Sequence, residues 1–149
     1  MQADRKELIL KHATQARVRY ADTDKMGVMS NVRYLEYFEV GRSEMMRHFG
    51  LPYRNLENLG YLLPVVEAKI EFISPAFYDD LLSIEATYLR EIKPTIRFEY
   101  NIYVDNTTVA KGYTLHCFLD EKTRKPVKPP KEFWDSLQEI EERINATNE

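Results

Sequence analysis

The chain has 149 residues, 44% of them hydrophobic and 30% charged, so we expect one globular domain over 1–149. A net charge of −3 argues against nucleic acid as a partner, and no apolar run is long enough for a membrane span. Cys117 is the single cysteine, which excludes an internal disulfide or a cysteine-based zinc cluster. Because the N-terminal segment also lacks an apolar signal core, the sequence predicts a cytoplasmic protein.

The first predicted elements are a strand and a long helix joined by an acidic loop. Polar and apolar side chains alternate over 14–20, which predicts a half-buried strand. The helix is expected to open at Ser30 or Asn31, both favourable N-cap residues, and to end at Gly50 after about five turns. Its broad apolar surface predicts a helix enclosed by other elements, and Gly41 inside it indicates close approach of a neighbouring backbone.

Four more strands and a second helix complete the predicted fold. After a connector at 51–61, alternating patterns predict strands near 62–73, 82–88, 96–104 and 109–119, and a short helix at 132–144. We therefore expect an α+β fold of the order β-α-β-β-β-β-α, with a five-stranded antiparallel sheet wrapped around one long central helix. Residues 1–12 and 145–149 are expected to be flexible ends.

Asp22 and Asp24 lie just ahead of the predicted helix N-terminus. The free N–H groups and partial positive charge there can polarise a carbonyl, while a nearby carboxylate can attack that carbonyl or activate water. The same acids can instead turn the chain and complement the helix dipole, and the residues alone leave both interpretations open. A calcium loop is a poor match, because its fifth and twelfth positions are Met26 and Arg33 rather than oxygen ligands.

Other familiar chemistries find little support in the sequence. The stretch 41–45, GRSEM, lacks the second glycine of a serine-hydrolase elbow and lies inside the predicted helix. His116 and Cys117 are neighbours in a strand, so their side chains point to opposite faces and do not form a dyad. Glu39 and Arg42, three positions apart on the helix, are expected to form an ion pair that orders it.

The segment 20–42 carries a D-x-D-x-x-G-V motif followed by several aromatic residues. This segment resembles the signature of hotdog-fold acyl-CoA thioesterases, and most closely the 4-hydroxybenzoyl-CoA thioesterase-like family with its Tol–Pal-associated branch. A second matching pattern, F-x-x-P-x-x-x-D-D, begins at Phe72, and the tail K-P-V-K-P-P covers 125–130. The resemblance therefore extends over nearly the whole chain and implies a hotdog fold.

The resemblance implies a hydrolytic site with two central groups. Asp24, the second acid of the motif, matches the catalytic carboxylate, and the backbone N–H of Asn31 matches the donor that polarises the thioester carbonyl. Asp22 is then left as loop structure. The residues expected to contact the substrate around these groups are Gly27, Val28, Tyr34 and Phe38.

Arg90 and Lys93 match a position at which the family contacts coenzyme A phosphates, although a solvated turn fits them equally well. The implied substrate is an acyl-CoA, the implied assembly is a homodimer or homotetramer with the site at the subunit boundary, and no metal or other cofactor is expected. Two alternatives stay open: a non-catalytic module that binds acyl-CoA or an acyl carrier, and a thioesterase acting on acyl carrier protein. Neither the acyl group nor the choice between a nucleophilic and a general-base Asp24 follows from the sequence.

Overall fold

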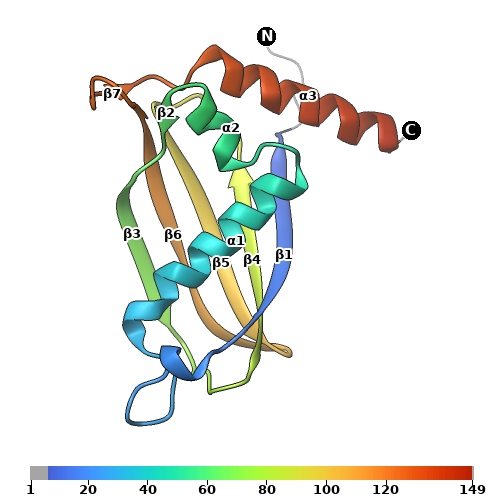
Figure 1. Cartoon of the computed structure of the whole chain (residues 1–149). Helices are drawn as coiled ribbons and strands as arrows, with labels where there is room; N and C mark the ends of the chain where they lie inside the picture. The colour runs from blue at the N-terminus through green and yellow to red at the C-terminus, as the bar shows by residue number, and fades with distance from the viewer. Residues whose placement is uncertain (1–6, 149) are drawn as a thin grey trace.

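The computed structural model describes residues 7–148 and shows an antiparallel sheet curled around a central helix (Figure 1). The long strands are β1 (Ile9–Arg17), β3 (Val65–Phe72), β4 (Leu81–Leu89), β5 (Thr95–Val104) and β6 (Thr107–Asp120), and the two-residue strands β2 (Tyr61–Leu62) and β7 (Pro126–Val127) pair with β6. The helices are α1 (Tyr34–His48), α2 (Tyr53–Asn58) and α3 (Lys131–Thr147), and the 3₁₀ turns η1 (Tyr20–Asp22) and η2 (Asn31–Arg33) precede α1. The expected α+β hotdog fold is confirmed.

Strand pairing places two important loops at opposite ends of the sheet. β1 pairs with β4 in an unbroken antiparallel register, from Ile9 opposite Leu89 to Arg17 opposite Leu81. The acidic loop follows the Arg17 end of β1, whereas the 90–94 loop follows the Leu89 end of β4. In Figure 1 the acidic loop is at the bottom, and α3 crosses the opposite end.

The core lies between α1 and the concave face of the sheet. Phe38 of α1 is 0% exposed and stacks on Tyr100 of β5, with ring centroids 4.3 Å apart. Gly41 lets α1 approach β4, because a Cβ at this position would lie 2.5 Å from Cγ2 of Ile84. The predicted enclosure holds only for the sheet-facing side of α1, because Leu35 and Val40 are 44% and 39% exposed, and the close neighbour of Gly41 is a side chain rather than the expected backbone.

Both chain ends are more ordered than predicted. β1 begins at Ile9, and Leu10 is 4% exposed, so 9–12 belong to the sheet instead of a flexible lead-in. α3 continues to Thr147, and Arg143 donates a 2.8 Å hydrogen bond to the carbonyl of Phe49, so 145–147 belong to the helix. The rest of that prediction falls mainly on 1–6 and 149, which lie outside the described residues.

The region between α1 and β3 also differs from prediction. The supposed connector 51–61 contains α2, which Leu56 anchors with 1% of its surface exposed. The predicted strand over 62–73 is divided, since β2 ends at Leu62 and β3 begins at Val65. Pro64 explains the break, because proline has no N–H to donate to a ladder.

β3 forms an open edge of the sheet. Among the described residues, its ladder partner is β6 on one side. The side chains of Val65, Val66 and Phe72 are 47%, 54% and 50% exposed, so large apolar side chains of this strand face solvent. An unpaired edge with large exposed apolar side chains indicates an interaction surface.

No helix within 7–148 is both long and apolar enough to cross a membrane.

Candidate active site

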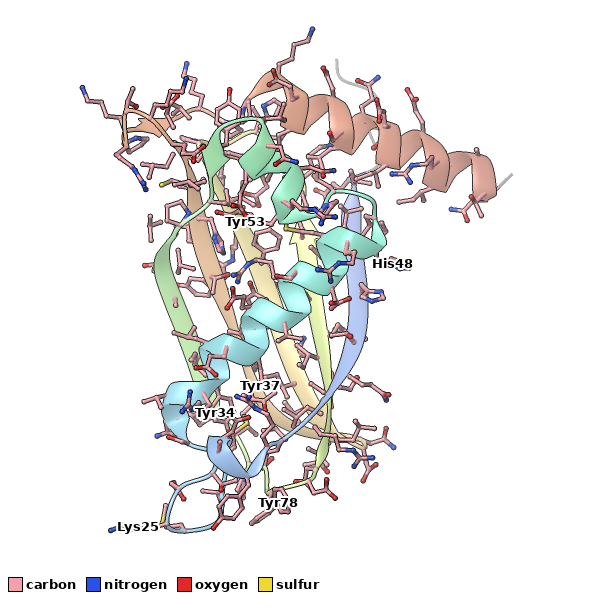
Figure 2. The ribbon with its side chains drawn as sticks, in the orientation of Figure 1. Lys25, Tyr34, Tyr37, His48, Tyr53 and Tyr78 are labelled. Carbon is pink, nitrogen blue, oxygen red and sulfur yellow. The ribbon has the colours of Figure 1, made fainter. Side chains whose placement is uncertain are left out.

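The acidic loop folds into a tight turn that holds its two carboxylates apart. The Asp24 N–H donates to the Val28 carbonyl at 2.9 Å, and the Ser30 N–H donates to the Asp22 carbonyl at 2.8 Å. Gly27 has a φ of +79°, a conformation that side chains with a Cβ rarely adopt, and this residue closes the turn. Figure 2 shows Lys25 at the outer tip of the loop, away from the sheet.

Asp22 is the buried anchor of the loop, with 0% of its surface exposed. Arg19 donates to both of its carboxylate oxygens, at 2.9 and 3.1 Å, and the Tyr37 hydroxyl from α1 donates to Oδ2. The Arg19 hydrogen bonds lower the pKa of the Asp22 carboxyl, while burial and the Asp22 carboxylate raise the pKa of Tyr37 to about 12. Asp22 is therefore an anion that joins the loop to α1, as its expected structural role requires.

Asp24 has the opposite environment, because its side chain is exposed at the surface. Its Oδ1 accepts a 2.8 Å hydrogen bond from the N–H of Met26, which fixes the carboxylate relative to the turn. Its second carboxylate oxygen, Oδ2, accepts no hydrogen bond from any donor within 7–148. Asp24 thus presents an oriented carboxylate with a free oxygen, which is what a nucleophile or a general base requires.

The predicted opening at Ser30 or Asn31 falls on the 3₁₀ turn η2, which has Ser30 as its N-cap residue and Asn31 as its first residue, whereas α1 itself begins at Tyr34. Ser30 has extended backbone angles and makes no side-chain capping bond. N–H groups in the first turn of a helix have no intrahelical acceptor, so the N–H of the exposed Asn31 is available to a ligand. The loop delivers this donor and the Asp24 carboxylate to the same end of the sheet.

The expected substrate-contact residues divide into two groups. Gly27 and Val28 lie on the loop itself, where Val28 bridges to Phe77. Tyr34 is 3% exposed and packs edge-on against Phe72 of β3 with ring centroids 5.0 Å apart, so it connects the start of α1 to the open edge. Phe38 has no exposed surface, and the expectation that it contacts the substrate is corrected to a role in the core.

Arg90 and Lys93 do not join the site within one chain. They follow the far end of β4, and the nine-residue strand separates the two loops by about 30 Å. Arg90 donates a 2.7 Å hydrogen bond to Glu141 of α3, and Lys93 pairs with Glu91 at 2.9 Å. The 90–94 loop is therefore tied to α3 at the opposite end of the protomer from Asp24.

Two polar contacts of α1 were not predicted. The expected ion pair between Glu39 and Arg42 is wrong, since no ion pair of either residue is found within 7–148, and Arg42 instead donates to the Tyr100 hydroxyl at 3.0 Å. No local motif in the sequence reports the contact of Tyr37 with Asp22, whereas the three-residue spacing of Arg19 and Asp22 is visible there. Such long-range partners become evident only when the fold brings β5 and the loop against α1.

Comparison with a known family identifies the superfamily of the chain. Residues 18–137 match the family model described as the Thioesterase-like superfamily. The chain belongs to the thioesterase-like superfamily. This match covers most of the chain, including the acidic loop, α1 and all the long strands except β1.

Individual relatives of this thioesterase-like protein support the same placement. It is 36% identical over 118 residues to the acyl-CoA thioesterase YbgC of Haemophilus influenzae, covering 78% of this chain and 86% of the relative. Among solved structures, a probable thioesterase from Bartonella henselae has a TM-score of 0.74 and 33% identity, covering 80% of this chain and 99% of that one. A hypothetical protein from Thermus thermophilus has a TM-score of 0.78 and 28% identity, covering 87% and 97%. The family resemblance read from the motif is confirmed, whereas the Tol–Pal branch stays a prediction.

Proposed function

We propose that the protein is an acyl-CoA thioesterase that uses Asp24 as its catalytic carboxylate and the N–H of Asn31 as the donor to the thioester carbonyl. The observation that carries this proposal is a fixed, exposed carboxylate on the same short loop that leads into an uncapped helix N-terminus. The relative from Haemophilus influenzae, named an acyl-CoA thioesterase, supports an acyl-CoA as the substrate. The products are a free acid and CoA.

The chemistry assigns separate tasks to the two groups. As a general base, Asp24 takes a proton from water while the water oxygen attacks the thioester carbon; the C–S bond then breaks, and the leaving CoA thiolate takes the proton back from Asp24. As a nucleophile, its free oxygen attacks that carbon and displaces the CoA thiolate to give a mixed anhydride, which water then hydrolyses. In both routes the carbonyl oxygen gains negative charge that the Asn31 N–H stabilises, and losing one such donor typically costs about 2.7–4 kcal/mol. The carboxylate and the N–H carry these steps without requiring a metal or another cofactor.

A homodimer is the assembly that completes this site. One chain holds Asp24 and the basic pair Arg90 and Lys93 about 30 Å apart along the sheet. An isologous dimer along the open β3 edge turns the second protomer end for end, so basic groups of one chain approach the acidic loop of the other. The exposed Val66 and Phe72 on this edge support such a pairing. A homotetramer would be built from two of these dimers.

We infer a cytoplasmic location from the chain's single cysteine, Cys117, which is a free thiol. A reducing compartment keeps such a thiol reduced.

An acyl carrier protein is the second possible donor of the acyl group, because the basic 90–94 loop suits an acidic partner as well as a phosphate. Turnover measured on CoA-linked and carrier-linked forms of the same acyl group distinguishes these two substrates.

A panel of acyl-CoAs, assayed by release of free thiol, tests the proposed function. We expect turnover on at least one member of the panel, and its loss in Asp24→Asn. Absence of thiol release from every acyl-CoA and every acyl carrier would overturn the proposal in favour of a binding module. Single turnover in ¹⁸O-labelled water then tests the nucleophilic route, because label enters the Asp24 side chain only when water attacks the carboxyl carbon of a mixed anhydride.

A further inference from the structure

A cleft beside α1 lies outside the site described above. It occupies about 410 Å³ between α1 and the segment that joins α2 to β3. Its wall is mixed: the apolar side chains of Leu35, Met46, Tyr53, Leu63 and Val65 lie beside the cation Arg42 and the carboxylates of Glu36 and Glu39. The apolar part suits the body of a ligand, and Arg42 is the one cation among the lining residues that can receive an anionic group.

Arg42 is a half-buried cation that forms no ion pair with the described residues, 7–148. No carboxylate within 7–148 lies within 4.0 Å of its guanidinium, although ten ion pairs form elsewhere in that range. One N–H donates to the Tyr100 hydroxyl at 3.0 Å, and a guanidinium has five N–H donors. The remaining donors are available for a ligand in the cleft.

A buried chain of hydrogen bonds fixes the position of this guanidinium. Tyr100 bonds to Thr114 at 2.6 Å, Thr114 to Nε2 of His116 at 2.8 Å, and Nδ1 of His116 to the Leu63 carbonyl at 3.0 Å. Arginine only donates and a carbonyl only accepts, so every proton along the chain points from Arg42 toward Leu63. Tyr100, Thr114 and His116 are each at most 1% exposed. This buried hydrogen-bond network therefore holds the Arg42 guanidinium in a fixed position.

The cleft continues the line of the proposed catalytic groups. Asn31, Leu35, Glu39, Arg42 and Met46 recur at spacings of three and four, which places them on one side of the helix. Eleven positions separate Asn31 from Arg42, about 16 Å at a helical rise of 1.5 Å per residue. An acyl group whose carbonyl lies at the Asn31 N–H reaches Arg42 only if it is long.

We propose that this cleft binds the distal end of a long acyl group that ends in a carboxylate, with Arg42 as the residue that receives this carboxylate. Planar guanidinium and carboxylate groups form paired, charge-assisted hydrogen bonds. The exposed Glu39 stands between Asn31 and Arg42, so a shorter chain would place its carboxylate beside a like charge. The catalytic part of this inference depends on the proposed thioesterase activity, whereas the binding part does not.

Kinetics with matched substrates test the assignment. Pairs of acyl-CoAs of equal chain length, one ending in a methyl and the other in a carboxylate, are compared across a series of lengths. We expect kcat/KM to favour the carboxylate form only at long chain lengths. Arg42→Gln, which keeps an N–H for Tyr100, should lower kcat/KM for that form by about 10- to 100-fold through KM, and change the methyl form little. Arg54→Gln, an exposed arginine on α2, is the control for lost charge and should leave both unchanged.

Calorimetric titration with a free long-chain dicarboxylic acid separates this inference from the proposed function. We expect it to bind more tightly than the monocarboxylic acid of equal length, and Arg42→Gln to abolish the difference. Binding without any thioesterase turnover would retain the cleft assignment and reject the proposed function. Turnover without a carboxylate preference at any length, or equal losses on both substrates in Arg42→Gln, would overturn the cleft assignment.

Discussion

The carboxylates of Asp22 and Asp24 are two positions apart in the chain and lie in opposite environments. Asp22 is completely buried and bonded by Arg19 and Tyr37, whereas Asp24 is exposed with one free oxygen. Burial with three charge-assisted donors makes a carboxylate a fixed part of the structure, while exposure leaves it available for chemistry. The loop therefore separates its two acids into a structural anchor and a catalytic candidate.

Asp22→Asn should destabilise the fold. The substitution removes the charge that Arg19 and Tyr37 bind, and a lost hydrogen bond to a charged group costs about 1.5–3 kcal/mol. Urea unfolding followed by circular dichroism measures this loss. Asp24→Asn is the matched control and should change the free energy of unfolding by less than about 0.5 kcal/mol, since the residue is at the surface. Equal destabilisation by the two variants would contradict the separation of roles.

Tyr37→Phe should make the protein more sensitive to acid. The pKa of Asp22 is lowered from 3.8, so its stabilising contribution is present above that value and is lost as the pH falls through the lower folded pKa. Removing the Tyr37 hydroxyl raises the folded pKa toward the unfolded one, which moves the loss to higher pH. The midpoint of acid unfolding should rise relative to wild type. A midpoint unchanged within error would show that Arg19 alone holds the carboxylate.

His116 should make stability depend on pH in the mildly acidic range. Burial lowers the pKa of His116 from 6.5 to about 4, so the unfolded chain binds the proton more readily between these values. Stability from the neutral imidazole is present above pH 6.5 and falls as the pH drops toward 4, by about 3 kcal/mol at about 1.4 kcal/mol per pKa unit.

The comparison that checks this prediction is wild type against His116→Gln, each unfolded in urea from pH 7 to pH 4. The difference between their free energies of unfolding should shrink as the pH falls, because only wild type must accept the proton on unfolding. A difference that is constant over this range would mean that His116 titrates alike in the folded and unfolded chains.

The periodic elements could be predicted because their signals are local. Alternation identified the strands, and the capping residues with Gly50 placed the limits of the helix to within a few positions. The contact of Asp22 with Tyr37 joins residues 15 positions apart, and that of Arg42 with Tyr100 joins residues 58 apart, so no local pattern reports them. The open edge at β3 could not be predicted, because an apolar edge that awaits a partner has the same alternation as a strand that packs within its own chain.

A charge on the open β3 edge should dissociate the dimer and reduce activity. Val66 is 54% exposed on this edge, and Val66→Asp places a carboxylate where the partner strand is proposed to pair. Light scattering after size-exclusion chromatography should detect monomers, and thiol release should fall with the dimer fraction. Leu59→Asp, at a residue 52% exposed beside α2, is the control and should leave assembly unchanged. A fully active monomer would refute a site shared between two chains.

The role of Asp24 as the catalytic carboxylate is tested most directly by kcat for thiol release, measured with folded Asp24→Asn on the best acyl-CoA from the panel. We expect kcat to fall about 100-fold or more if Asp24 is the general base, and further if it is the nucleophile, while circular dichroism and the unfolding midpoint match wild type. Asp22→Asn, measured below its unfolding transition, should retain far more of the activity. An Asp24→Asn enzyme that turns over at the wild-type rate would contradict the assignment of Asp24 as the catalytic carboxylate.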